Sequence, residues 1–251
     1  MNAPAHASAP VAQRLRLRYA RGGRLRFASH RDFQRVFERA IRRASLPMAY
    51  SQGFNPHPRI SYAGAAPTGA ASEAEYLEIG LTVPCDPDKV MAALNLALPT
   101  DMQVLDIVEG RTAGFAERLE ASVWQLALPE VDSAVAAAAV ADLLAAERVE
   151  VERLTKDGKR TLDARAAIVS LRVEDLVRPT RTDPCAILDL VVRNGSPSVR
   201  PDDVLAALRK AGDLVPPVTP RATRLAQGPL LAAGGVADPL GPDRFEVAAE
   251  V

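Results

Sequence analysis

The sequence has few of the residues that build redox or metal centres. Two cysteines, Cys85 and Cys185, stand far apart in 251 residues, and no C-x-x-C pair occurs. This excludes a disulfide framework and a typical iron–sulfur site. Two cysteines and three scattered histidines do not suit structural zinc. The phosphate loops G-x-x-x-x-G-K-[ST] and G-x-G-x-x-G are also absent. We therefore expect neither a metal nor another cofactor.

Long apolar segments are absent as well. No run approaches the roughly 20 residues that a membrane span needs. The first residues, "MNAPAHASAPVAQ", contain no positive region followed by an apolar core. A composition of 48% apolar and 25% charged residues is typical of a globular protein. We expect a cytoplasmic protein that does not contact a membrane.

Positive charge is concentrated in one segment, although the formal net charge of the chain is zero. From Arg14 to Arg59 the sequence has twelve arginines, no lysine and two acids, Asp32 and Glu38. This segment therefore has a formal charge of +10, which the rest of the chain balances. We expect these arginines to gather on one exposed surface. Such asymmetry indicates a polyanionic partner.

Hydrophobic periodicity predicts a βαββαβ order in the first half. The stretch "RLRLRYA" (14–20) alternates as a strand does, and "LRFAS" (25–29) extends a hairpin or continues that strand. A helix follows with Ser29 as its N-cap, and Pro47 ends it. The remaining elements are strands at 59–65, 74–83 and 102–110 and a helix at 86–98.

The second half repeats this order with an insertion near 157–180. The expected fold class is α+β, with two tandem ferredoxin-like (βαββαβ) sandwiches and antiparallel sheets. The expected boundaries are a disordered tail at 1–13, an N-terminal domain with an arginine-rich face at 14–112, a C-terminal domain at 120–227 and a disordered tail at 228–251.

The helix after Ser29 would present an arginine-rich face and lead into a polar loop, "SQGFNPHPR" (51–59). Its arginines recur at about one-turn spacing opposite the apolar stripe. The loop offers amides, an imidazole and an aromatic ring for hydrogen bonding and base stacking. The alternatives are a solvated helix face and a rigid turn with Phe54 and Tyr62 in the core. The candidate binding residues are Arg31, Arg35, Arg39, Arg42, Gln52, Phe54, Asn55, His57 and Arg59.

Catalysis has only conditional candidates. His30, His57 and Tyr50 would form an acid–base set for RNA cleavage if the fold brought them together. His30 begins the arginine-rich helix and the other two lie after its end, so the sequence does not assure their proximity. These three residues are therefore candidates, and no residue is assigned to catalysis.

Two further charged groups need an interpretation. Glu73, Glu75 and Glu78 are expected to form salt bridges with arginines of the basic helix rather than to hold a metal. A second, smaller basic patch at a solvated hairpin tip comprises Lys156, Lys159, Arg160 and Arg165.

Several stretches resemble one bacterial family. "SHRDFQRVFERA", "PMAYSQGFNPHP", "SEAEY" and "SVRPD" are similar to the radical-SAM-linked (radical-SAM-associated) proteins of unknown function, over roughly residues 14–227. The matching positions are Ser29, His30, Asp32, Tyr50, Ser51, Gln52, Gly53, Asn55, Pro56, His57, Pro58, Arg59, Glu73, Glu75, Tyr76, Asp163 and Arg165. The resemblance implies cooperation with a radical SAM protein, and the gene neighbourhoods of relatives imply a link to RNA or ribosomes.

These observations favour a radical-SAM-associated accessory module that binds RNA or a ribonucleoprotein through the arginine-rich face and the 51–59 loop. The radical SAM cysteine motif is absent, so the chain is at most a partner of that chemistry. The alternatives are a metal-independent endoribonuclease of the tandem ferredoxin-like type and a protein-only docking subunit for a radical SAM enzyme. Arginine suits phosphate and carboxylate equally, so the sequence does not separate RNA from an acidic protein as the partner.

Overall fold

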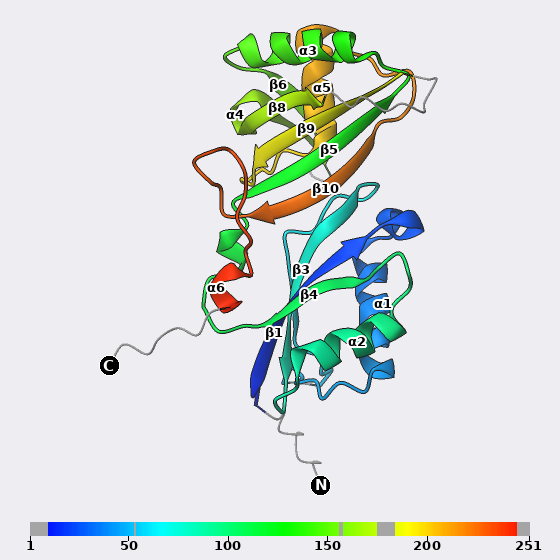
Figure 1. Ribbon diagram of the computed structural model, residues 1–251, viewed down its shortest axis with the longest axis vertical. Coiled ribbons are helices and arrows are strands. Elements are labelled where there is room, and N and C mark those ends of the chain that lie inside the picture. Colours follow the sequence, from blue (N-terminus) through cyan, green and yellow to red (C-terminus); the bar gives the residue numbers. More distant parts are fainter. Residues whose placement is uncertain (1–9, 53, 156–157, 175–183, 245–251) are drawn as a thin grey trace, which may run out of the picture. The chain divides into compact units, whose positions relative to one another are not determined.

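The computed structural model describes residues 10–52, 54–155, 158–174 and 184–244, which belong to two compact units (Figure 1). Unit 1 comprises Met1–Ala116 and Pro239–Val251, and unit 2 comprises Glu117–Asp238. Several expectations fall outside the described residues: the tail at 1–9, the turn at Gly53, Lys156, the far part of the insertion and residues 245–251. The predicted mixed α+β class with antiparallel sheets is observed.

Four strands of unit 1 pair antiparallel, in the order β4-β1-β3-β2. Its elements are β1 (Gln13–Arg21), the 3-10 helix η1 (Gly23–Phe27), α1 (His30–Arg43), β2 (Ile60–Ala63), β3 (Ala71–Leu81), α2 (Pro87–Ala97) and β4 (Val104–Glu109). The prediction of strand at 25–29 is wrong. Gly23 turns the chain with a φ of 44°, and the N–H of Ala28 donates to the carbonyl of Leu25, three residues back, so a 3-10 helix forms instead.

The core of unit 1 lies between the sheet and the two helices. The pleat of β1 directs Leu15, Leu17 and Tyr19 to this side, as the alternation predicts. Tyr19 stacks on Phe33 of α1 with ring centroids 5.1 Å apart. The Ser29 hydroxyl accepts from the N–H of Asp32 and caps α1, so the predicted start of this helix is confirmed.

The chain returns to unit 1 at its end, which the sequence did not predict. The short helix α6 (Gly241–Arg244) places Asp243 in a fully buried position beside Arg16 of β1. Asp243 also accepts from the backbone N–H groups of Arg111 and Thr112, each at 3.0 Å. The interpretation of 228–251 as a disordered tail is therefore wrong for residues 228–244, because one buried carboxylate anchors a segment of otherwise loop-like composition.

Four strands of unit 2 pair antiparallel, in the order β10-β5-β9-β8, and β6 and β7 form a separate hairpin. After the turn η2 (Ala116–Arg118) its elements are β5 (Ala121–Pro129), α3 (Ser133–Ala145), β6 (Glu150–Thr155), β7 (Gly158–Asp163), α4 (Ala164–Ala167), β8 (Ile168–Glu174), β9 (Cys185–Arg193), α5 (Pro201–Gly212) and β10 (Arg221–Gly228). None of the helices in the described ranges is long and apolar enough to cross a membrane.

The insertion in unit 2 lies earlier than the sequence predicted. It consists of the β6–β7 hairpin and α4, while residues from Ile168 onward already belong to β8 of the main sheet. Val151 and Leu162 lie opposite each other in the hairpin, and both side chains are buried. One side of the hairpin is therefore buried against unit 2, as is usual for antiparallel strands with one solvent-exposed face. The expected position near 157–180 is corrected accordingly.

Candidate functional site

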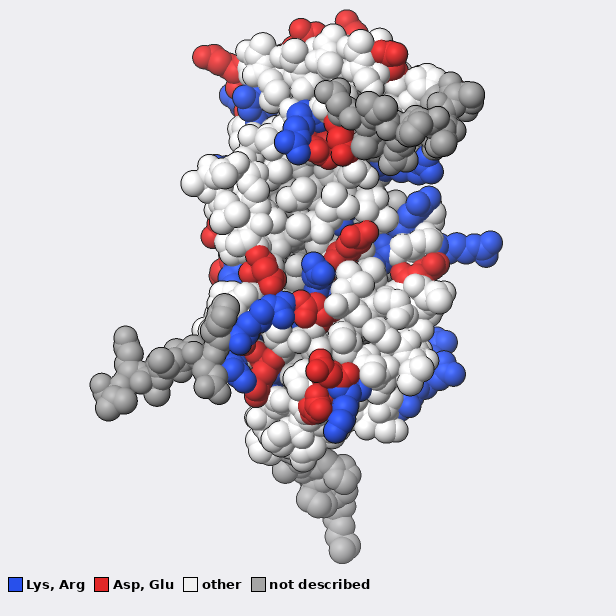
Figure 2. Space-filling model, viewed as in Figure 1, with Lys and Arg blue, Asp and Glu red and all other residues white. Residues whose placement is uncertain are grey.

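The outer face of α1 is lined by arginines. Phe33, Phe37, Ala40 and Ile41 are buried on the inner face. The exposed outer face contains the α1 arginine stripe, which comprises Arg31, Arg35, Arg39, Arg42 and Arg43. Figure 2, drawn in the same view as Figure 1, shows basic side chains along the edge of unit 1 where Figure 1 draws α1. The fold therefore presents the predicted binding arginines of this helix to solvent.

Very little within the described residues neutralises the α1 arginine stripe. Arg35 lies 3.6 Å from Asp32, and both side chains are more than half exposed, so solvent screens this pair. Successive arginines four residues apart repel each other, which destabilises a helix by about 0.2–0.5 kcal/mol per pair. Three such pairs occur, from Arg31 to Arg43. An anionic partner on this face would relieve the repulsion.

Arg14, Arg16 and Arg21 of the basic segment do not join this surface. The pleat that buries Leu15 turns Arg14 and Arg16 to the other side of the sheet, where both lie 2.9 Å from Glu78. Arg21 is buried and donates to the carbonyls of Ala66 and Pro67, each at 3.0 Å. The expectation of one exposed surface for all twelve arginines is therefore wrong. Strand alternation divides them between two sides of unit 1, and several are structural.

The acidic residues of β3 also differ from the prediction. Glu78 pairs with strand arginines rather than with the helix, since it lies directly opposite Arg16 in the β1–β3 ladder. Glu75 is buried and accepts from the N–H of Ala66 at 3.2 Å, while Glu73 is exposed. The predicted salt bridges to α1 are thus wrong. In the described part of the chain no group of three or more His, Cys, Asp or Glu is placed to hold a metal ion.

The 51–59 loop is closed at its base by backbone hydrogen bonds. The N–H of Ser51 donates to the carbonyl of His57 at 2.8 Å, and the Ser51 hydroxyl accepts from the N–H of His57 at 3.0 Å. The N–H of Arg59 donates to the carbonyl of Ala49 at 2.8 Å. The chain thus leaves α1 and enters a loop with a fixed base, and the exposed side chains in the described part of this loop are Gln52, Phe54, Asn55, Pro56, His57 and Arg59.

The two aromatic candidates have different environments. Phe54 is fully exposed, so the alternative in which it enters the core is wrong. Tyr62 packs edge-on against His30 and Phe33, with ring centroids 5.2 and 5.9 Å away. Its hydroxyl is buried and has no hydrogen-bond partner among the described residues. Burial raises the pKa of Tyr62 above its ordinary value, and the charge of Glu38 adds to the shift. Phe54 therefore remains available for stacking, whereas Tyr62 is structural.

The candidate acid–base set is not assembled. His30 is the first residue of α1, whereas Tyr50 and His57 lie in the loop region beyond its last residue. A helix of 14 residues is about 21 Å long, which is far beyond hydrogen-bond reach. The loop base is fastened to the end of β3, because the N–H of Ala49 donates to the carbonyl of Gly80. The cleavage alternative therefore has no geometric support from these three residues.

The second basic patch is also divided. Lys159 pairs with Glu152 at 3.0 Å, and Arg165 donates to the carbonyl of Leu144 at 3.3 Å. Arg160 instead faces a hollow that it shares with Arg153 and Arg200, neither of which was a candidate. The signal for Arg200 was present, since it stands in the stretch "SVRPD".

Comparison with known proteins identifies a family and no activity. No curated protein matches the chain. Among solved structures, DyPB from Rhodococcus jostii RHA1 is similar at 11% identity, covering 83% of this chain and 86% of that one, with a TM-score of 0.20 that supports no argument. The family described as "Uncharacterized protein conserved in bacteria (DUF2344)" matches residues 14–201, well over half of the chain. The protein therefore belongs to this uncharacterised bacterial family.

Proposed function

We propose that this protein is a cytoplasmic accessory module that binds single-stranded RNA, alone or in a ribonucleoprotein, through the α1 arginine stripe and the 51–59 loop. The observation that carries the proposal is the stripe itself. Five exposed arginines share one helix face, and among the described residues they form a single, solvent-screened salt bridge, between Arg35 and Asp32.

The two parts of this surface would contribute differently. Guanidinium groups bind phosphates with little regard to base identity and give an affinity that falls as salt rises. Phe54 projects from the fastened loop base and would stack on one unpaired base. Asn55 and Gln52 offer amide hydrogen bonds to base edges. This combination favours single-stranded RNA over a duplex, whose bases are not open to stacking.

We also propose that both units are ferredoxin-like. The order β4-β1-β3-β2 in unit 1 and the order β10-β5-β9-β8 in unit 2 support this, because each equals 4-1-3-2 when the β6–β7–α4 insertion is set aside. In unit 1 such a plan places α1 on one side of the sheet with its outer face open. The proposal does not depend on any distant structural relative.

The suggested partner is a radical SAM protein. The stretches that resemble the radical-SAM-linked family support this partnership, and the chain lacks the cysteines to perform that chemistry itself. The accessory role would be to present an RNA to the enzyme. If the arginine stripe instead docks on an acidic face of the enzyme, no RNA is needed, and the same surface residues would serve.

Crosslinking in cells, followed by sequencing of the bound RNA, tests the proposal. We expect the wild-type protein to yield RNA above background, and Arg35→Glu with Arg39→Glu to lose most of it. Co-purification of partners is measured in parallel, with and without ribonuclease. An absence of crosslinked RNA, together with partners that resist ribonuclease, would instead favour protein-only docking.

A further inference from the structure

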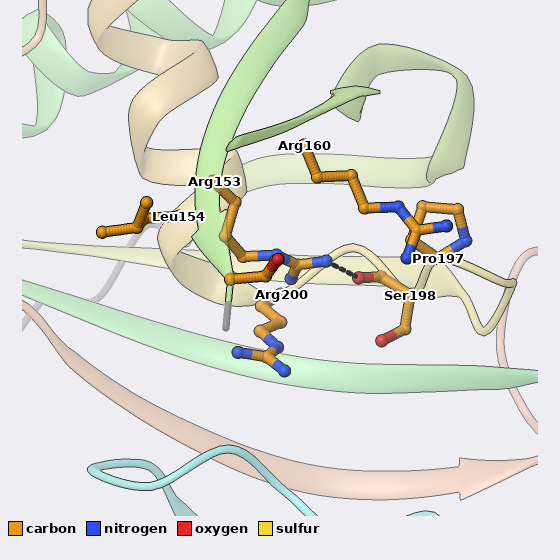
Figure 3. A pocket seen from close by; sticks show the side chains of 7 residues that line it. Arg153, Leu154, Arg160, Pro197, Ser198 and Arg200 are labelled. Carbon is orange, nitrogen blue, oxygen red and sulfur yellow. Dashed lines mark hydrogen bonds between the residues drawn. The ribbon is translucent and has the colours of Figure 1, made fainter. Parts of the chain in front are cut away.

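Unit 2 has a basic pocket that the proposed function does not use. Its cavity volume is about 450 Å³. The β6–β7 hairpin and the segment that leads into α5 form its walls (Figure 3). The residues that line the basic pocket are Arg153, Leu154, Thr155, Arg160, Pro197, Ser198 and Arg200.

One of the three arginines is neutralised and holds the walls together. Arg153 Nη1 lies 2.9 Å from the carboxylate of Asp203, and Nη2 donates to the carbonyl of Ser198 at 3.1 Å, the contact dashed in Figure 3. The same carboxylate accepts from the backbone N–H of Arg200 at 2.7 Å. Asp203 is buried in the first turn of α5. It therefore joins the hairpin to the helix, and its charge also acts on Arg200.

Neither Arg160 nor Arg200 forms a salt bridge with a described residue of unit 2, although Asp203 lies close enough to Arg200 for their charges to interact. Arg160 stands directly opposite Arg153 in the hairpin ladder, an arrangement of like charges that destabilises a strand pair. Its neighbour Lys159 forms a salt bridge with Glu152. Among its described residues, the hairpin therefore supplies an acidic partner for Lys159 but none for Arg160. Arg200 and Arg160 are both exposed to the hollow. Both side chains thus line one cavity.

We propose that the basic pocket binds a phosphate monoester dianion, on a free nucleotide or at a terminus of RNA. Two guanidinium groups without a salt bridge among the described residues favour a ligand with a charge near −2, and their planar forks suit bidentate contact with phosphate oxygens. The hydroxyl of Ser198 supplies a further donor at the wall. The volume falls in the range of sites for small ligands of nucleotide size. An internal phosphodiester has one charge and is the poorer ligand.

Calorimetric titration with AMP and with inorganic phosphate tests the pocket. We expect one saturable site, with affinity reduced about tenfold, or 1.4 kcal/mol, in each of Arg160→Gln and Arg200→Gln. The matched control is Lys159→Gln, which removes the same charge from the same hairpin outside the pocket and should change affinity less than about twofold. Thermal melts check that all variants fold. Arg153 is not substituted, because its loss would remove the salt-bridge partner of the buried Asp203.

Two oligonucleotides of one sequence, with a 5′-phosphate or a 5′-hydroxyl, identify the source of the phosphate. Tighter binding of the phosphorylated oligonucleotide, lost in Arg160→Gln, would identify an RNA terminus as the ligand. Equal binding of the two oligonucleotides, together with saturable binding of AMP in the calorimetric titration, would identify a free nucleotide. Failure of AMP, phosphate and the phosphorylated strand to bind overturns the proposal, as does an equal loss in Lys159→Gln. AMP binding does not involve α1, so this proposal and the RNA-binding proposal fail separately.

Discussion

Arg16 and Asp243 are 227 positions apart, yet Arg16 Nη1 lies 2.6 Å from Asp243 Oδ2, and both side chains are buried. The other oxygen of Asp243 accepts from the hydroxyl and the N–H of Thr112. Arg16 also contacts Glu78 and lies over the ring of Phe115, 4.9 Å from its centroid. This network fastens the last turn of the described chain to the sheet side of unit 1 that α1 does not cover.

Removing the carboxylate of this pair should destabilise unit 1. Asp243→Ala leaves a buried guanidinium with one acidic partner fewer, and we expect a loss of about 3–5 kcal/mol in the free energy of unfolding. Urea denaturation measures it. The control Glu73→Ala, at an exposed position of β3, should change stability by less than about 0.5 kcal/mol. Equal stability of Asp243→Ala and wild type would show that the network is not stabilising.

Tyr62 provides a prediction with a pH dependence. Its hydroxyl is buried without a hydrogen-bond partner in the described part of the chain, so Tyr62→Phe should stabilise the protein at pH 7, by about 1 kcal/mol. Burial raises the pKa of Tyr62 above 10.0, so above pH 10 the unfolded chain releases a proton that the folded chain keeps. Wild-type stability then falls as pH rises, and Tyr62→Phe lacks this contribution. Unfolding curves at pH 7 and above pH 10 should show a growing difference between the two proteins, and a constant difference would contradict this.

Charge repulsion on α1 makes a stability prediction independent of any ligand. Arg39 has an arginine one turn before it and another one turn after it. Arg39→Gln should therefore raise the free energy of unfolding by about 0.5 kcal/mol at low salt, and the gain should vanish at high salt. Thermal melts at two ionic strengths measure this. A loss of stability at low salt would mean that the side chain packs on the helix rather than repelling its neighbours.

Stacking by Phe54 is tested with a matched apolar residue. Phe54→Ala should weaken binding of single-stranded RNA by about 1–3 kcal/mol, the usual contribution of one stacked base. Because Phe54 is fully exposed, the substitution should not change stability. Leu96→Ala removes another exposed apolar side chain of the same unit, on α2, and should leave affinity unchanged. Fluorescence anisotropy with a labelled strand measures both, and equal losses would remove the stacking role.

The local pattern of the sequence predicted most of unit 1. Leu15, Leu17 and Tyr19 alternate with arginines, and that spacing alone assigns them to the core side of a strand. Ser29 and the apolar spacing after it likewise define the start and the inner face of α1. These features depend on neighbours within a few residues, which a single sequence displays directly.

Features that depend on distant partners were not predictable in the same way. Arg16 was counted as exposed charge because its partner Asp243 lies in a segment with no periodic pattern. Arg200 and Arg160 belong to separate segments and come to line one hollow only when the hairpin packs beside the start of α5. Sequence composition therefore located the basic segment correctly but overestimated how many of its arginines reach one surface.

The salt dependence of RNA binding tests the central claim most directly. Wild-type affinity for single-stranded RNA should fall steeply with salt, and Arg35→Glu with Arg39→Glu should weaken binding and reduce the slope of log K against log[salt] by about 1.4, since each phosphate contact contributes roughly 0.7. Arg193→Glu with Arg209→Glu makes the same change in net charge at exposed positions of unit 2 and should leave the slope unchanged. A wild-type affinity that does not respond to salt, or an equal loss in both double variants, would contradict an RNA-binding role for α1.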